Sequence, residues 1–379
     1  MAARRGLAYD RGLGLMAAGS GRLESMRNKR EYLARLFGRI GLVRMMERLG
    51  ASRPGLVVLT YHRIAEPGSD PFYDPVISAT PDSFRAQVEW LARGPRVLAL
   101  EEAIEWITSA GRWREPAVLV TFDDGYRDNF DIAVPILRER GVPATFFLPT
   151  AFLEEPRLPW WDRVACILKQ TRVNRLELPL WSDGEAGSGD GPPALTIDLT
   201  QTSRPAAIRA VIDAFLDGRI ADEPWFLTML ADRAEVALDS SAMARALFAD
   251  WGQVRGLTGP DTGLSVGSHG HSHRRLAALE HDAQRAELIG SRRILEDRLG
   301  LRIEALAYPY GWPGSFDERT RSIAAEAGYR VAFASFEGIN HRDSTDSFAV
   351  RRLGVGSGDS AVLLRARVAL HATFGRSFL

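Results

Sequence analysis

The sequence predicts an α/β protein with a parallel sheet, either a barrel or a doubly wound sheet, and three observations support this fold class. Short apolar runs without strict polar alternation recur along the chain, as is typical of strands buried on both faces. Segments with helical periodicity and recognisable ends lie between these runs. Residues 151–260 interrupt the alternation and predict a mostly helical insertion in one loop of the sheet.

The predicted strands are the apolar runs Gly55–Tyr61, Val97–Leu100, Ala117–Phe122, Ala144–Leu148, Leu264–Gly267, Ala305–Tyr308, Val331–Ala334 and Ala349–Val355. Thr80-Pro81-Asp82 begins a helix, because proline is favourable in the first turn. Three further helices are expected to end at Gly141, Gly300 and Gly328, where glycine adopts a left-handed conformation at low cost.

The insertion contains a loop rich in Gly, Asp and Pro over 182–193, followed by helical patterns over 206–216, 224–237 and 242–251. It belongs to a main domain predicted over 51–379.

Residues 1–28 are rich in Gly and Arg and predict a flexible extension. Residues 29–50 predict an amphipathic helix with interspersed arginines. Its segment 29–49 either packs on the main domain or contacts an anionic membrane peripherally.

Composition excludes several classes of partner and site. Lys plus Arg equals Asp plus Glu, 48 against 48, which gives no electrostatic attraction to nucleic acid. The single cysteine, Cys166, excludes an intramolecular disulfide and agrees with a reducing compartment. No apolar run resembles a signal-peptide core or a membrane span, so a cytoplasmic location is expected. No protein partner is identifiable.

Chemically capable residues follow the predicted strands. His62 follows the first strand, Asp123 and Asp124 follow Ala117–Phe122, and His269 follows the run that begins at Leu264. Tyr308-Pro309-Tyr310 closes another strand. Because the carboxyl ends of parallel strands converge on one mouth of a barrel, we expect these side chains to meet.

Two clusters carry most of the chemical signal. Adjacent carboxylates such as Asp123 and Asp124 repel unless a cation or hydrogen-bond donors compensate, although a simple turn is the alternative. Three of the seven histidines, His269, His271 and His273, lie within five residues, and neutral imidazoles are good metal ligands. A solvated polar loop is the alternative for this segment. Two histidines with one aspartate leave open positions on a metal, as a catalytic site requires.

These residues together resemble the polysaccharide deacetylase (NodB-homology) family of metal-dependent carbohydrate esterases. The resemblance covers about residues 55–355 and rests on Thr121–Gly125, on Gly267–His273 followed by Leu276, and on Ala307–Gly311. It implies a deformed (β/α) barrel of about seven parallel strands. It also implies one divalent metal, usually Zn²⁺, with Co²⁺, Mn²⁺, Ni²⁺ or Fe²⁺ as alternatives.

Carried over residue by residue, the resemblance assigns Asp124, His269 and His273 as metal ligands and Asp123 as general base. A bound cation lowers the pKa of its water to about 7 and polarises the acyl oxygen. Asp123 beside the metal takes the proton of that water. A backbone N–H near Tyr310 is expected to stabilise the oxyanion. His271 is expected to be a neighbour of the site and not a ligand.

The chain departs from the family pattern at several positions. Leu306-Ala307-Tyr308 lacks the arginine that many members place before the third motif, so Arg352 is assigned to contact the base. Gly270 stands at the position after His269 where family members usually have Ser or Thr. A Leu-x-His motif is only half matched near His371, so His62 is the predicted catalytic acid, with a structural hydrogen bond as its alternative.

The remaining predicted site residues contact the substrate or the oxyanion. They are Tyr308, Pro309, Tyr310, Trp160 and Trp161. Aromatic rings here either stack on a sugar or pack at a helix start.

The sequence therefore predicts an enzyme that hydrolyses linear amide C–N bonds, removing an N-acetyl or similar acyl group from an amino sugar. The expected substrate is an N-acetylated glycan or glycolipid, with a lipid-linked or nucleotide-linked sugar favoured. Two alternatives stay open. In the first, an enzyme of the same fold acts on a non-sugar amide, a cyclic imide or a formyl group. In the second, the chain is a non-catalytic carbohydrate-binding relative.

Overall fold

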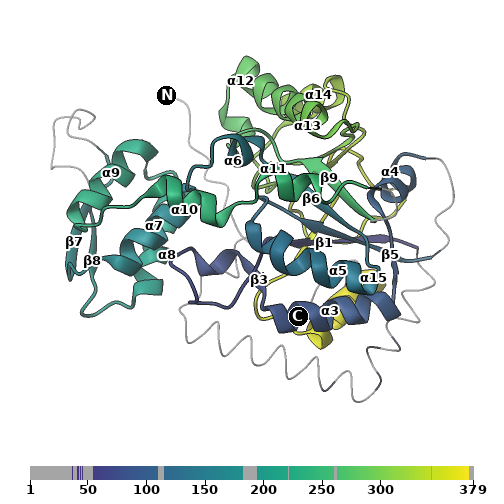
Figure 1. Cartoon of the computed structure of the whole chain (residues 1–379), viewed down its shortest axis with the longest axis horizontal. Coiled ribbons are helices and arrows are strands. Elements are labelled where there is room, and N and C mark those ends of the chain that lie inside the picture. Colours follow the sequence, from purple (N-terminus) through teal and green to yellow (C-terminus); the bar gives the residue numbers. More distant parts are fainter. Residues whose placement is uncertain are drawn as a thin grey trace, which may run out of the picture.

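A curled parallel sheet with flanking helices forms the main body, and the insertion forms a lobe beside it (Figure 1). The computed structural model describes residues 54–109, 115–181, 194–220, 222–259, 263–342 and 344–374, together with residues 36, 41, 43 and 45. No helix within these ranges is long and apolar enough to cross a membrane.

The main sheet contains seven parallel strands in the order β11-β10-β9-β6-β5-β1-β12, as the barrel prediction requires. Their bounds are β1 Leu56–Tyr61, β5 Ala117–Phe122, β6 Ala144–Leu148, β9 Leu264–Ser268, β10 Ala305–Ala307, β11 Val331–Phe333 and β12 Leu353–Gly354. An eighth strand, β4 (Arg96–Val97), pairs with the start of β5. Every residue of β1, β5 and β6 is buried, which explains why these runs lack polar alternation.

One irregular segment closes the ring between its two outer strands. Val350 bridges to Phe333 of β11, and Leu353 of β12 then pairs with Leu59 of β1. The sheet is therefore a deformed barrel. The predicted strand Ala349–Val355 is divided between these two pairings, and only Leu353–Gly354 forms a regular strand.

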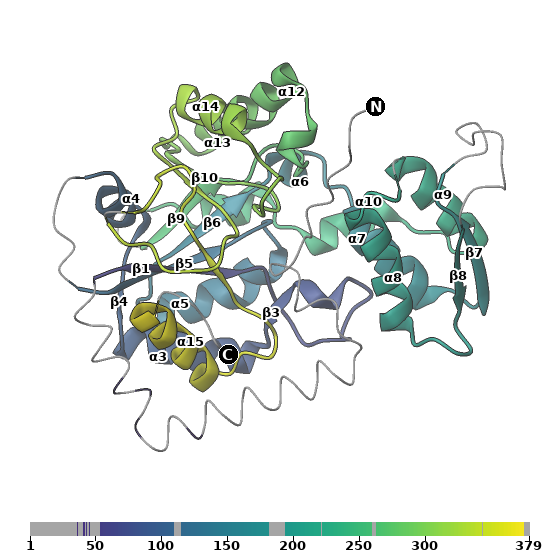
Figure 2. The ribbon, with the colours of Figure 1, turned by 180° about the vertical axis from the view of Figure 1, so that it is seen from behind.

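Helices cover the outside of the sheet, with α3, α5 and α15 on one side and α12, α13 and α14 on the other (Figures 1 and 2). Their bounds are α3 Pro81–Arg93, α4 Leu100–Thr108, α5 Val134–Arg140, α6 Thr150–Glu154, α11 Trp251–Arg255, α12 His281–Arg285, α13 Ser291–Leu299, α14 Glu318–Glu326 and α15 Ala361–Phe374. Short turns of other helix types occupy Asp74–Val76, Asn129–Ala133, Leu276–Ala278 and Ala286–Gly290, and the two-residue β2 (Arg63–Ile64) pairs with β3 (Ile77–Ala79).

The helix ends follow the predicted signals. The Thr80 side chain accepts a hydrogen bond from the Ser83 N–H at the start of α3. Gly141 and Gly300 end α5 and α13 with φ of 63° and 66°. One boundary prediction was wrong: Val97–Leu100 is not one strand, because Leu100 starts α4 and buries its side chain there.

The insertion folds around its own apolar core. Its helices are α7 Trp160–Gln170, α8 Arg204–Leu216, α9 Glu223–Arg233 and α10 Ser240–Leu247. It also contains an antiparallel pair of strands, β7 (Arg175–Pro179) and β8 (Ala194–Asp198), which the sequence analysis missed. The alternation of buried Leu176 and Leu178 with exposed neighbours was the available signal.

The predicted extension 1–28 lies outside the described residues, as does nearly all of the predicted helix 29–50. Val43 is described and is buried in a cluster with Leu363, Ala366 and Leu370 of α15. Leu36 and Met45 are exposed. The burial of Val43 agrees with the alternative in which this segment packs on the main domain, and membrane contact stays a prediction.

Candidate active site

Three predicted metal ligands meet at the carboxyl ends of β5 and β9. Asp124 Oδ1 lies 3.4 Å from Nε2 of His269 and 3.3 Å from Nε2 of His273. One ligand atom from each residue lies within 4.8 Å of the others, and all three side chains are buried. Asp124 Oδ1 accepts no hydrogen bond from any described residue. This donor set suits one divalent cation.

Strained backbone marks the same place. Among the described residues, four that are not glycine have positive φ, and three belong to this site: Asp124 (72°), His273 (55°) and Tyr310 (63°). Such conformations cost free energy and concentrate at functional sites. Gly270 also has positive φ (72°), so glycine, unlike the usual Ser or Thr, fits the backbone here without strain.

The histidine loop is held by hydrogen bonds that the sequence did not reveal. His269 Nδ1 lies 2.8 Å from the carbonyl oxygen of Ala307, which orients its Nε2 toward Asp124. The buried carboxylate of Glu287 accepts the backbone N–H groups of His271 and Ser272, at 2.9 and 2.8 Å. Glu287 lies in the turn after α12, and no local pattern singled it out.

His271 takes no part in the three-ligand group. Its Nδ1 lies 2.8 Å from Thr150 Oγ1, and its backbone carbonyl accepts the N–H of Ala151 in α6. This side chain therefore anchors the loop to α6, as expected for a neighbour of the site.

Arg352, which directly precedes β12 in the segment that closes the barrel, contacts Asp123. Its Nη1 lies 2.9 Å from each Asp123 carboxylate oxygen, and both side chains are 2% exposed. Burial opposes the charge of Asp123, but Arg352 and then His269 outweigh it and lower the pKa of this carboxyl. Arg352 Nε also donates to Ala334 O, which fixes the guanidinium in place.

Asp124 shows the same balance. Burial disfavours its carboxylate, but the imidazoles of His273 and His269 outweigh that cost and hold its pKa well below the usual range. Both mouth carboxylates are therefore kept ionised by cationic or donor groups from other strands.

His62 is half-buried at the end of β1, and its charge contributes to the lowered pKa values of both Asp123 and Asp124. Its backbone N–H donates to Ser78 Oγ. His371, by contrast, is buried in α15 with Nδ1 against Arg367 O, so the half-matched Leu-x-His motif lies in a packed helix.

The aromatic residues assigned to substrate binding divide into two groups. Tyr308 is fully buried, stacks on Phe316 and donates its hydroxyl to Phe348 O, so its side chain belongs to the core. Trp161 is also buried, with its ring 5.4 Å from that of His273.

Tyr310 and Trp160 are half-buried and lie together. The Trp160 indole donates to Tyr310 Oη at 3.3 Å, and the Tyr310 ring centroid lies 4.9 Å from that of His273. Pro309 is buried beside Gly270.

Comparison with a family model matches residues 110–173 and 215–332 to polysaccharide deacetylase. YxkH from Bacillus subtilis, whose name also refers to polysaccharide deacetylase, is 35% identical over 94 residues, or 24% of this chain. The poly-β-1,6-N-acetyl-D-glucosamine N-deacetylase of Staphylococcus epidermidis is 29% identical over 116 residues, or 27% of this chain. The matched regions span 31% and 39% of the length of these two relatives.

Two solved structures share the fold. The Streptococcus pyogenes deacetylase PplD, in complex with acetate, superposes with a TM-score of 0.51 at 17% identity, covering 83% of this chain and 97% of its own. IcaB from Ammonifex degensii superposes with a TM-score of 0.50 at 18% identity, covering 84% of this chain and 97% of its own. At these identities the likeness concerns the fold.

Proposed function

Because this chain belongs to the polysaccharide deacetylase family, we propose that it is a metal-dependent hydrolase that removes an N-acetyl or similar acyl group from an amino sugar in a glycan or glycolipid. The observation that carries the proposal is the juxtaposition at the barrel mouth. Asp124, His269 and His273 form a three-ligand group, and Asp123 stands beside it in a separate ion pair with Arg352.

Asp124 Oδ1 and the Nε2 atoms of His269 and His273 would hold the metal, and Zn²⁺ suits two imidazoles with one carboxylate. A divalent cation at such a site supplies Lewis acidity, which polarises the acyl carbonyl and makes water a better nucleophile. The three protein ligands leave positions for water and substrate.

Asp123 acts as the general base in this proposal. Its Oδ2 lies 3.8 Å from His269 Nε2, close to the ligand group but outside it. One carboxylate oxygen takes the proton of the attacking water while Arg352 holds the group in position. The lowered pKa of Asp123 keeps it ionised and ready to accept that proton.

The backbone N–H of Tyr310 serves as the oxyanion donor. It donates to no acceptor within the described part of the chain, whereas the neighbouring Gly311 N–H donates to Pro309 O. The strained φ of Tyr310 holds this N–H in a fixed direction. His62, half-buried near both aspartates, is the proposed acid that protonates the leaving amine.

Trp160 and Tyr310 form the proposed sugar platform. Both rings are half-buried, the two side chains are joined by a hydrogen bond, and Tyr310 stands beside the ligand His273. A sugar ring stacked there would place its acyl group near the metal ligands.

The test combines metal content with product release. The purified protein is depleted with a chelator, reloaded with Zn²⁺, Co²⁺ or Mn²⁺, and assayed for acetate release from N-acetylhexosamine oligomers, lipid-linked N-acetyl sugars and small amides. We expect metal-dependent release from the sugars. Activity that survives complete metal removal would contradict the mechanism, and turnover of the small amides alone would contradict the substrate class.

A further inference from the structure

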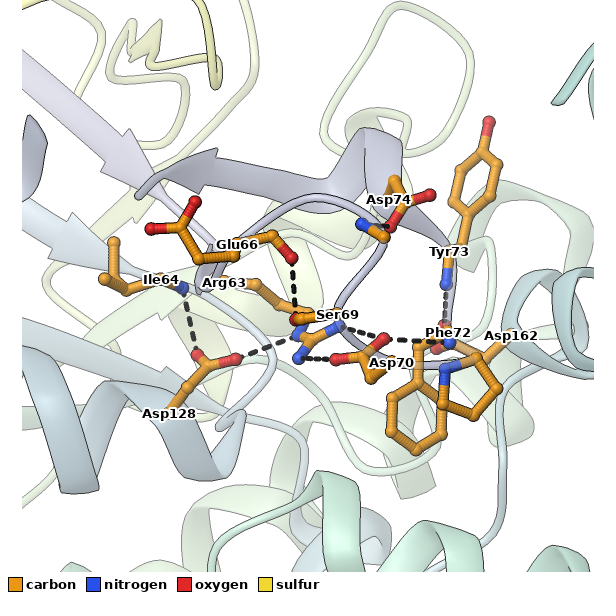
Figure 3. Close-up of polar contacts among 12 residues, drawn as sticks. Arg63, Ile64, Glu66, Ser69, Asp70, Phe72, Tyr73, Asp74, Asp128 and Asp162 are labelled. Atoms are coloured by element: carbon orange, nitrogen blue, oxygen red, sulfur yellow. Dashed lines mark hydrogen bonds and ion pairs between the residues drawn. The ribbon is translucent and has the colours of Figure 1, made fainter. Parts of the chain in front are cut away.

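Three carboxylates gather where the loop after β2 meets α7 of the insertion (Figure 3). We call this group, consisting of Asp70, Asp128 and Asp162 with Arg63, the seam. Arg63 pairs with Asp70 at 2.7 Å and with Asp128 at 2.9 Å. Figure 3 shows both of these carboxylates turned toward the Arg63 guanidinium. One guanidinium therefore pairs with two of the three carboxylates.

Asp162 differs from the other two. Its side chain is 0% exposed, and Oδ1 accepts the backbone N–H of Tyr73 at 2.9 Å. Oδ2 is fully buried and accepts nothing from the described residues. A buried carboxylate oxygen without a donor costs several kcal/mol, so donors are expected nearby.

Three other buried side-chain atoms also lack a hydrogen-bond partner among the described residues: Tyr126 Oη, Trp161 Nε1 and His273 Nδ1. Burial raises the pKa of Tyr126, the charges of Asp124 and Asp162 raise it further, and a polar contact with Trp161 lowers it. The Trp161 ring lies 5.4 Å from the His273 ring. These contacts connect His273 to Asp162 by way of Trp161 and Tyr126.

The two ligand histidines differ in how their second ring nitrogen is held. His269 places Nδ1 against the carbonyl oxygen of Ala307. If His273 binds metal through Nε2, its Nδ1 carries a hydrogen that needs an acceptor. Ligand histidines nearly always give this hydrogen to a carboxylate, a carbonyl or a water.

We propose that Asp162 is a positioning residue of the metal centre, which receives the Nδ1–H of His273 through an ordered water shared with Tyr126. Such a water would accept hydrogen bonds from His273 Nδ1 and the Tyr126 hydroxyl and donate to Asp162 Oδ2, a coordination typical of buried water. The Trp161 N–H faces the Tyr126 oxygen. This inference rests on the proposed function, because it requires His273 to be a ligand.

The test is the metal affinity of Asp162→Asn against that of Asp70→Asn. Each variant removes one negative charge from the seam, but only the first replaces the unpartnered acceptor with an amide that can present a donor. Equilibrium dialysis and the visible spectrum of bound Co²⁺ measure affinity and geometry without turnover. We expect Asp162→Asn to bind Co²⁺ roughly 10- to 100-fold more weakly. Asp70→Asn should stay within about twofold.

Tyr126→Phe provides a second variant that keeps the ring stacked on Phe248 and removes only the hydroxyl. We expect a smaller loss of affinity, and less than additive losses when it is combined with Asp162→Asn. Thermal unfolding of the metal-free proteins separates stability from affinity. Wild-type affinity in folded Asp162→Asn, or equal losses in Asp162→Asn and Asp70→Asn, would overturn this proposal. Failure of the folded wild type to bind metal would instead overturn the proposed function.

Discussion

The mouth of the barrel and the seam with the insertion treat buried carboxylates in opposite ways. At the mouth, burial is outweighed by Arg352, His269 and His273, and the pKa values of Asp123 and Asp124 are lowered. At the seam, where Asp162 of α7 meets the loop after β2, burial raises the pKa of Asp162 to about 7, and Asp162 accepts a hydrogen bond from the backbone N–H of Tyr73. Equal burial therefore gives opposite shifts, because neighbouring charges decide the outcome.

The largest effect is expected at the mouth from Asp124→Ala. This change removes the only carboxylate of the three-ligand group, so the purified protein should lose both bound metal and deacetylation. Elemental analysis after dialysis against Zn²⁺, together with acetate release, measures the two losses. A variant that kept stoichiometric metal would show that Asp124 is not a ligand.

Asp123→Asn separates the base from the ligands. The amide keeps the size of the side chain but cannot accept the proton, so turnover should fall by roughly 10²–10⁴-fold while metal content stays at the wild-type level. Steady-state kinetics with the best acetylated sugar gives the first value and elemental analysis the second. Wild-type turnover would refute the role of Asp123 as base.

At the seam, Asp162→Asn should change how stability depends on pH. Asp162 has a higher pKa in the folded chain, about 7, than its ordinary value of 3.8. Folded wild type therefore holds this proton more tightly than the unfolded chain, and its free energy of unfolding falls as pH rises between these values. The amide does not ionise. Across this window the free energy of unfolding of the variant should therefore rise relative to that of wild type by a few kcal/mol, at about 1.4 kcal/mol per pKa unit.

Denaturant unfolding of metal-free protein at several pH values measures this difference. The advantage of the variant should level off above about pH 7, where wild-type Asp162 is ionised in both states. Parallel curves for the two proteins over the whole range would show that Asp162 does not titrate differently on folding.

The smallest effect is expected from His271→Ala. This variant tests which imidazoles balance the charges of the carboxylates at the mouth. His271 contacts Thr150 and stands outside the three-ligand group, so metal content should be unchanged. Turnover should fall only a few-fold through loosening of the loop. The matched variants His269→Ala and His273→Ala should each lose metal, and equal losses at all three positions would refute the ligand assignment.

Local patterns determined much of this protein. Continuous apolar runs predicted the buried strands, and Thr80 and Gly141 predicted helix ends, because capping depends on neighbours within one turn. The three motifs also supplied the residues of the mouth. Their position after strands predicted that they would meet, since parallel strands bring their carboxyl ends to one edge, and the family resemblance supplied their roles.

Tertiary structure alone decided how individual side chains are used. Tyr308 and Tyr310 are two residues apart, yet one packs in the core and the other stands beside His273. The sequence assigned no role to Glu287 or Asp162, because their partners are backbone N–H groups that lie far away in the chain. Hydrogen bonding and burial at such positions depend on how the barrel closes and where the insertion docks, which no short-range periodicity encodes.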